Sequence, residues 1–97
     1  MYRVEIISNL SLEFDLHEHI NRIENDFGEN IYYSQIYDVH GKGRKGKKQG
    51  DGVWPGENFI LIIYTEKLIV IERLRSIVDI LKQEYPTEGI KFFIIGN

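Results

Sequence analysis

The segment FILIIYT, residues 59–65, is an unbroken apolar run in the second half of a 97-residue chain. Its β-branched and aromatic side chains favour a strand, and apolar side chains on both faces are typical of a strand in the middle of a sheet. A glycine-rich stretch precedes the run and a helically periodic stretch follows it. We therefore expect a central strand here, between a loop and a helix.

After this strand, the sequence predicts a helix over about 66–84 and a final strand over 90–95. Glu66 carries the charge that favours a helix start, and Pro86 ends the helix. Apolar residues recur at helical spacing along one stripe: Leu74, Ile77, Val78, Leu81 and Tyr85.

Before the glycine-rich stretch, the pattern predicts a strand, a helix and a second strand. Residues 2–8 alternate as a strand does. A helix then carries an apolar stripe and stops at Gly28; the stripe is Leu12, Leu16, Ile20, Ile23 and Phe27. Residues 30–40 form the second strand, with one face made of Ile31, Tyr33, Gln35, Tyr37 and Val39.

The order β-α-β-β-α-β predicts an α+β, ferredoxin-like fold in a single domain, residues 1–97. Its four-stranded antiparallel sheet carries both helices on one face. Adjacent apolar pairs such as Ile62 and Ile63 make the other face apolar as well. An apolar face without helices predicts that another copy of the chain covers it.

Positive charge is concentrated in the glycine-rich stretch, residues 41–52, which holds five Lys/Arg and five Gly. Residues 40–52 carry a net charge of +4, whereas the remainder carries −7. We expect a flexible basic loop that meets an anionic partner, although a loop kept soluble by its lysines has the same composition.

The start of this loop, VHGKGRKG at residues 39–46, resembles the V-x-G-x-G-R run that leaves the second strand in PII signalling proteins. The order of elements and the position of the loop agree with that family, and the end of the loop is similar to the CutA-like trimers. The resemblance implies a PII-like homotrimer of the short-loop kind, a nucleotide-binding signalling protein similar to the nitrogen regulators. It would bind ATP, ADP or AMP in clefts between subunits and an unknown partner protein through residues 41–52.

Carried over by position, the resemblance implies a set of ligand-binding residues: Ile7, Gly41, Lys42, Gly43, Arg44, Gly89 and Lys91. It implies a partner-binding set of Lys45, Lys47, Lys48 and Trp54, although Trp54 also suits an anchor against a neighbouring subunit. The chemistry agrees, because glycines expose backbone N–H groups to an anion and an arginine binds phosphate with two parallel hydrogen bonds.

The turn before the last strand, YPTEGIKFF at residues 85–93, departs from the family pattern T-G-x-x-G-D-G-K. Only Gly89 matches, Lys91 is displaced, and the Arg-x-Arg pair that follows the fourth strand in PII chains is missing. The anionic ligand is therefore open between an adenine nucleotide and a smaller carboxylate or bicarbonate, and no cofactor is assigned.

Two other functions stay open. A CutA-like trimer concerned with metal ions would use Asp38 and His40, which share the second face of the strand at 30–40. A binder of RNA or another polyanion would use the basic loop, but the acidic remainder argues against nucleic acid.

Catalysis and membrane insertion are not expected. The chain has no cysteine and no recognisable catalytic motif, so we expect no enzyme. The longest apolar run, residues 59–71, is interrupted by Glu66 and Lys67, so we expect a cytoplasmic protein without membrane insertion.

Overall fold

The computed structural model describes residues 1–41 and 57–96. The elements follow in the order β1 (Tyr2–Asn9), η1 (Leu10–Leu12), α1 (Glu13–Phe27), β2 (Ser34–Val39), β3 (Asn58–Thr65), α3 (Leu68–Glu84) and β4 (Ile90–Gly96). Apart from the short 3-10 turn η1, this is the predicted β-α-β-β-α-β order. The α+β, ferredoxin-like fold is confirmed.

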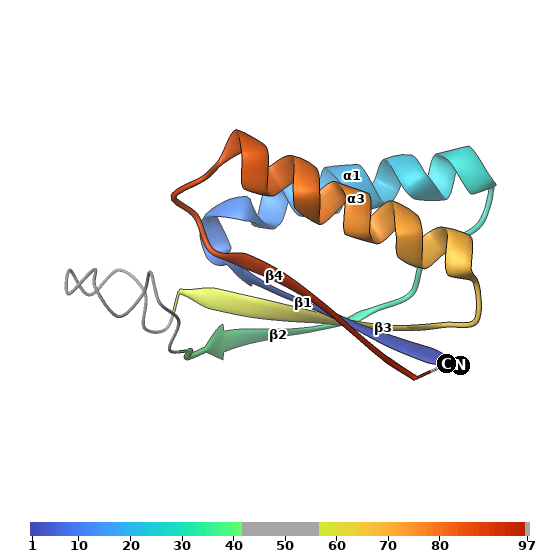
Figure 1. Ribbon diagram of the computed structural model, residues 1–97, viewed down its shortest axis with the longest axis horizontal. Helices are drawn as coiled ribbons and strands as arrows, with labels where there is room; N and C mark the ends of the chain where they lie inside the picture. The colour runs from blue at the N-terminus through green and yellow to red at the C-terminus, as the bar shows by residue number, and fades with distance from the viewer. Residues whose placement is uncertain (42–56, 97) are drawn as a thin grey trace.

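The four strands form one antiparallel sheet in the order β2-β3-β1-β4. The central strands are β3 and β1, as the apolar run at residues 59–65 predicted, while β2 and β4 form the two edges. Both helices lie on the same side of the sheet, above it in the view of Figure 1. No helix of residues 1–41 and 57–96 lies on the other side, so this part of the molecule has two layers and one open sheet face.

The core lies between the helices and the sheet. Alternate residues of the central strands point into it, and Val4, Ile6, Phe59, Leu61 and Ile63 are at most 1% exposed. The helical segments contribute the apolar stripes that the spacing predicted; the buried members are Leu12, Leu16, Ile20 and Ile23 in η1 and α1, and Leu74, Ile77, Val78 and Leu81 in α3. Burial of this apolar surface is the main force that holds the two layers together.

Local chemistry sets the ends of α1. The side chain of Asn9 accepts a hydrogen bond from the backbone N–H of Ser11 and so caps η1, which leads into the helix. Glu13 and Asp15 lie in the first turn of α1, where their charge complements the helix dipole. Gly28 ends the helix in the left-handed conformation, with φ of 69°, as predicted.

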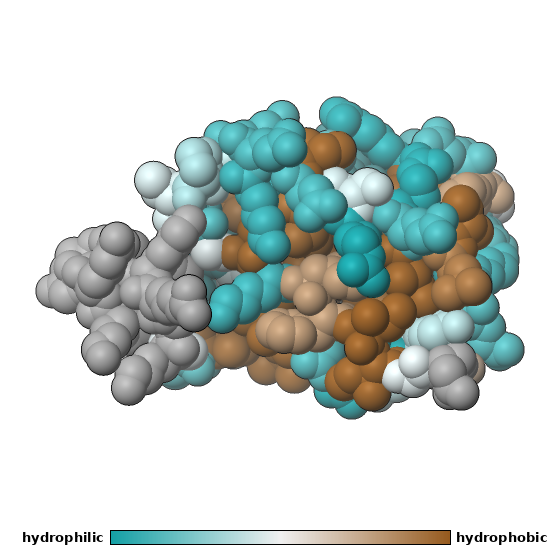
Figure 2. All heavy atoms as spheres, viewed as in Figure 1, coloured by the Kyte–Doolittle hydropathy of each residue, from teal (hydrophilic) through white to brown (hydrophobic). Residues whose placement is uncertain are grey.

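The open face alternates with the buried one along each strand. Its residues follow from the register: Arg3, Glu5 and Ile7 of β1, Ile60, Ile62 and Tyr64 of β3, Ser34 and Ile36 of β2, and Lys91, Phe93 and Ile95 of β4. Phe93 and Ile95 are 45% and 56% exposed. Figure 2 shows hydrophobic surface along the course of β4 at the edge of the sheet.

The second strand differs from its prediction at both ends. It begins at Ser34 rather than at residue 30, and Ile31, Tyr32 and Tyr33 precede it. The pairing with β3 shifts between Ile36 and Val39, and Asp38 has a positive φ of 58°. A shift of this kind is a β-bulge, which breaks the alternation of faces. Asp38 and His40 therefore do not share a strand face, contrary to the prediction.

The helix α3 (Leu68–Glu84) also differs from its prediction at both ends. It begins at Leu68, with Lys67 in the capping position, so Glu66 lies outside the first turn and does not meet the helix dipole there. Tyr85 follows the last helical residue and is 38% exposed, so it does not belong to the buried stripe. The backbone before Pro86 is the reason, since a residue before proline is disfavoured in the helical conformation.

Within the described ranges, no helix has the length and apolar character needed to cross a membrane. The predictions for residues 42–52 and for Trp54 lie outside the described residues.

Candidate functional site

A cluster of buried polar side chains lies at one end of the sheet. Ser8, Asn9 and Asn58 are the buried polar residues of the described chain. Ser8 Oγ donates to the Asn9 carbonyl oxygen at 2.9 Å, and Asn58 Nδ2 donates to the Val39 carbonyl oxygen at 3.0 Å. Because buried polar groups are costly unless they are hydrogen-bonded, these contacts fix the positions of the strand ends.

The same cluster fixes the turn before β4. The backbone N–H of Asn9 donates to the Gly89 carbonyl oxygen at 2.8 Å. Ser11 Oγ donates to Glu88 Oε1 at 2.6 Å, so the carboxylate of Glu88 is engaged by the residues that follow β1. The turn before β4, where the resemblance to PII-like proteins implied a ligand contact at Gly89, is therefore held against the end of β1.

Two predicted ligand residues are brought together next to this turn. Ile7 of β1 and Lys91 of β4 are direct partners in the antiparallel register, and both point to the open face. Ile7 is half-buried and Lys91 is exposed. Ile7, Gly89 and Lys91 thus form one group that combines an apolar surface with a cation.

Gly41 lies at the same end of the sheet but at the opposite edge. It follows β2, while Lys91 belongs to β4, and two strands separate these edges. With strands about 4.8 Å apart, the two edge strands are about 14 Å apart. A small ligand therefore does not contact both Gly41 and Lys91 of the same chain. Either an elongated ligand or a second copy of the chain has to bridge them.

The other predicted binding residues lie outside the described residues: Lys42, Gly43 and Arg44 of the ligand set, and Lys45, Lys47, Lys48 and Trp54 of the partner-binding set. Their roles stay predictions.

A polar network between α1 and β2 was not predicted. Gln35 Nε2 donates to Glu13 Oε2 at 2.7 Å, and Tyr37 Oη donates to the same oxygen. His17 Nε2 lies 2.8 Å from Gln35 Oε1, and the His17 ring lies 5.6 Å from the Tyr33 ring. The i, i+4 spacing of Glu13 and His17, beside the apolar stripe, was the signal available in the sequence.

This network shifts two pKa values. The hydrogen bond from Tyr37 lowers the pKa of Glu13, and the Gln35 hydrogen bond and the charge of His17 act in the same direction, against a partial desolvation that raises it. The same hydrogen bond raises the pKa of Tyr37. The carboxylate and the neutral phenol are therefore the favoured forms near neutral pH.

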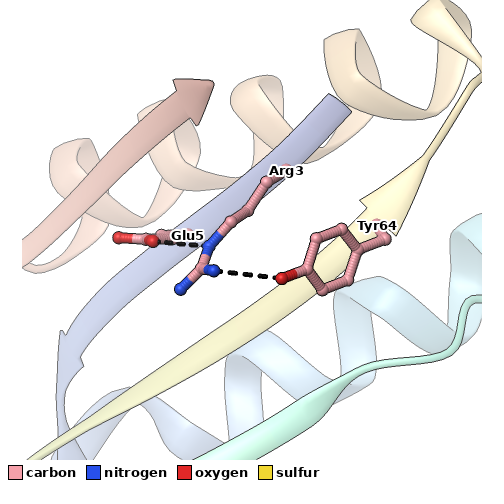
Figure 3. Close-up of polar contacts among 3 residues, drawn as sticks. All are labelled: Arg3, Glu5 and Tyr64. Carbon is pink, nitrogen blue, oxygen red and sulfur yellow. Dashed lines mark hydrogen bonds and ion pairs between the residues drawn. The ribbon is translucent and has the colours of Figure 1, made fainter. Parts of the chain in front are cut away.

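A second polar group lies on the open face, at the start of β1 (Figure 3). Arg3 Nε donates to Glu5 Oε2 at 2.7 Å, and Arg3 Nη1 donates to Tyr64 Oη at 3.0 Å. The guanidinium carbon lies 5.7 Å from the centroid of the Tyr64 ring. The positive charge of Arg3 is thus neutralised on a face that is otherwise largely apolar.

The candidate metal ligands Asp38 and His40 lie near the end of β2, and their role in a site shared between copies stays a prediction. Asp38 lies in the bulge and His40 lies beyond the last residue of β2. Throughout residues 1–41 and 57–96, there is no group of three or more His, Asp or Glu side chains that could hold a metal ion.

A shallow pocket lies at the other end of the sheet, away from Gly41 and Gly89. Its volume is about 140 Å³, and its walls include Phe27, Tyr32 and Tyr64, with Lys67 and Glu29 beside them. Lys67 and Glu29 form an ion pair. Of the predicted binding residues that the structure describes, none lines this pocket.

Comparisons with solved structures give the same fold over nearly the whole chain. A PII-like signalling protein of Thermus thermophilus, TTHA0516, is 25% identical, with a TM-score of 0.54 over 97% of this chain and 83% of that one. CPII, a nitrogen regulatory PII-like protein of Thiomonas intermedia K12 bound to ADP, AMP and bicarbonate, has a TM-score of 0.59 at 14% identity, over 99% of this chain and 92% of that one. CPII bound to ADP and bicarbonate has a TM-score of 0.61 at 16% identity, over 97% and 84% of the two chains.

No family model matches the sequence, and no curated protein matches it. The structural neighbours nevertheless confirm the resemblance that the loop sequence and the order of elements predicted. The chain has the fold of the PII-like signalling proteins. The 25% identity to TTHA0516 further supports its similarity to a PII-like family. Both neighbours are named for signalling or regulation.

Proposed function

We propose that this protein is a homotrimeric PII-like regulator that binds a small anionic ligand, an adenine nucleotide or a similar molecule, in the cleft between subunits. It contacts a partner protein through residues 41–52. The observation that carries the proposal is that the end of β1, the turn at Gly89 and the residue Gly41, which opens the basic loop, all lie at one end of the sheet.

The chemistry of this end suits an adenine nucleotide. Ile7 offers an apolar surface to a ring, and Lys91 beside it offers a cation to a phosphate. Lys42, Gly43 and Arg44 follow Gly41 in the sequence and add two cations and a glycine. The solved CPII structures hold ADP together with AMP or bicarbonate, which is the class of ligand proposed here.

The open sheet face supports a homotrimer. It carries Ile7, Ile60, Ile62, Phe93 and Ile95, and an apolar face of this kind is stabilised when another copy covers it. The separation of Gly41 from Lys91 supports the same assembly, because a cleft between copies can bring an edge of one sheet to an edge of the next. We propose that the protein acts in the cytoplasm and without catalytic turnover.

Calorimetric titration of the purified protein with ATP, ADP and AMP tests the ligand. We expect one nucleotide per subunit, and we expect Arg44→Ala to weaken binding about 10-fold or more, the size of a charge-assisted hydrogen bond. Arg22→Ala is the matched control, because it removes the same charge from an exposed position on α1.

Light scattering on the same samples gives the number of subunits. An assembly that gives no heat with any of the three nucleotides would contradict the nucleotide part of the proposal, and the titration would then be repeated with bicarbonate and acetate. Equal weakening by Arg44→Ala and Arg22→Ala would show that net charge, rather than a site at the loop base, determines the affinity.

A further inference from the structure

The edge strand β2 has little apolar anchoring of its own. None of its six residues is buried, and it pairs with β3 on one side only. The bulge between Ile36 and Val39 interrupts that pairing just before the strand ends. Side-chain contacts can therefore add substantially to the backbone pairing that holds this strand in position.

These contacts come from one stripe of α1, which we call the polar stripe: Glu13, His17 and Glu24. Residues at these spacings lie on the same side of a helix. Glu24 Oε2 accepts the backbone N–H of Ile31 at 2.7 Å, ahead of β2. Glu13 and His17 hold Gln35 and Tyr37 further along the strand. The polar stripe therefore contacts the chain ahead of β2 and two side chains within the strand, Gln35 and Tyr37.

The donor and acceptor roles of the side chains in this network follow from one another. Because Gln35 Nε2 donates to Glu13, Gln35 Oε1 is the acceptor, and His17 Nε2 must carry the hydrogen that it donates. Tyr37 adds a second donor to Glu13, and its ring also lies 6.5 Å from the ring of Phe59, which is fully buried. Each polar atom thus has a defined role, and Glu13 is the acceptor that both β2 side chains share.

We propose that Glu13 and His17 are positioning residues for the ligand site. By holding Gln35 and Tyr37, they determine where β2 places Gly41, four residues after Tyr37, at the ligand end of the sheet. This inference rests on the function proposed above, because it assigns the affinity of that site partly to residues that do not touch the ligand. A carboxylate suits the task, since charge-assisted hydrogen bonds are stronger than neutral ones.

Two measurements on the full chain test the inference, and the first needs no ligand. Hydrogen exchange of the backbone amides is compared in wild type, Glu13→Ala and Glu18→Ala. Glu18 is exposed on the same helix and its side chain makes no hydrogen bond or ion pair within the described part of the chain, so it controls for the lost charge. We expect Glu13→Ala to speed exchange several-fold in residues 34–41 while residues 58–65 exchange as in wild type.

The second measurement is the affinity for ADP of Glu13→Ala, Tyr37→Phe and the double variant. We expect Tyr37→Phe, which loses one hydrogen bond, to weaken ADP binding about 3-fold, and Glu13→Ala, which loses the bonds from both Gln35 and Tyr37, to weaken it about 10-fold. The double variant should lose little more than Glu13→Ala alone, because Glu13→Ala already removes the bond from Tyr37. Glu18→Ala should bind as wild type does.

The outcomes separate the two proposals. Unchanged exchange in residues 34–41 of Glu13→Ala would overturn the positioning role. Faster exchange with unchanged ADP affinity would show that the strand is held but that the ligand site does not depend on it, which also overturns the inference. If wild type itself does not bind ADP, the proposed function fails, and with it the effect on affinity, while exchange still decides whether Glu13 holds β2.

Discussion

Glu13 shows how the hydrogen bonds of one side chain can hold a strand, here β2, in position. It lies in the first turn of α1, where the helix dipole favours its charge, and it accepts hydrogen bonds from Gln35 and Tyr37. The ionised carboxylate is the better acceptor, which is why its pKa is lowered from the ordinary value of 4.5. The stabilisation that Glu13 provides should therefore depend on pH.

The direction of this dependence follows from the lowered pKa. A group with a lowered folded-state pKa stabilises the fold above its unfolded pKa, and the effect is lost as the pH falls through the folded-state value. We expect the difference in unfolding free energy between wild type and Glu13→Gln to be constant from about pH 5.5 to 7 and to shrink below about pH 4.5. Its size should be at most about 1 kcal/mol, because the group is only partly buried.

Urea unfolding at a series of pH values from about 3 to 7 measures this difference. Glu18→Gln is the control, and its curve should stay parallel to that of wild type. A Glu13→Gln curve that also stays parallel down to the lowest pH would show that the carboxylate of Glu13 has its ordinary pKa in the folded protein.

At the scale of the elements, α1 was the most predictable part of the fold. Its stripe of apolar residues, its acidic first turn and its glycine stop are all features of local sequence. By contrast, the bounds of β2 were wrong by several residues, because an exposed edge strand has no strong apolar alternation and its length depends on its pairing with β3.

The stop of α1 gives a prediction for Gly28. Its φ of 69° suits glycine, and no atom lies within 4 Å of the place where a Cβ would be added. Alanine should therefore cost only the backbone strain of the left-handed conformation, about 1–2 kcal/mol in unfolding free energy. Urea unfolding measures it, with Asn25→Ala in the last turns of the same helix as the control, where no loss is expected. An unchanged midpoint for Gly28→Ala would contradict the assigned cap.

At the scale of the whole molecule, the open sheet face is an apolar surface that nothing in the described part of the single chain covers. Arg3 is paired with Glu5 and Tyr64, so covering this end of the face does not strand its cation, while Lys91 at the other end is the cation proposed to meet the ligand. The face is therefore compatible with burial against other copies, as the homotrimer proposal requires.

A charge placed on this face tests the assembly. Phe93 is 45% exposed on the open face, and Phe93→Lys should break the trimer into monomers, because an unpaired cation is costly at an apolar interface. Ile80→Lys is the matched control, since Ile80 is 41% exposed but lies on α3, away from the sheet face. Light scattering gives the masses. Equal masses for Phe93→Lys and wild type would place the interface elsewhere, and a monomeric wild type would contradict the trimer.

The sequence by itself determined the order of the elements, the buried stripes, the cap at Gly28 and the resemblance to PII-like proteins, because periodicity, capping and loop composition are local properties of the chain. Only the tertiary structure decided that Ile7 lies beside Lys91, that Gly41 lies at the opposite edge, and that Glu13 meets Gln35 and Tyr37. These contacts join residues about 20 to 80 positions apart, and their geometry is set by strand register and by the packing of α1 on the sheet. Strand register and helix packing both depend on residues far apart in the chain, so no single segment of the sequence predicts them.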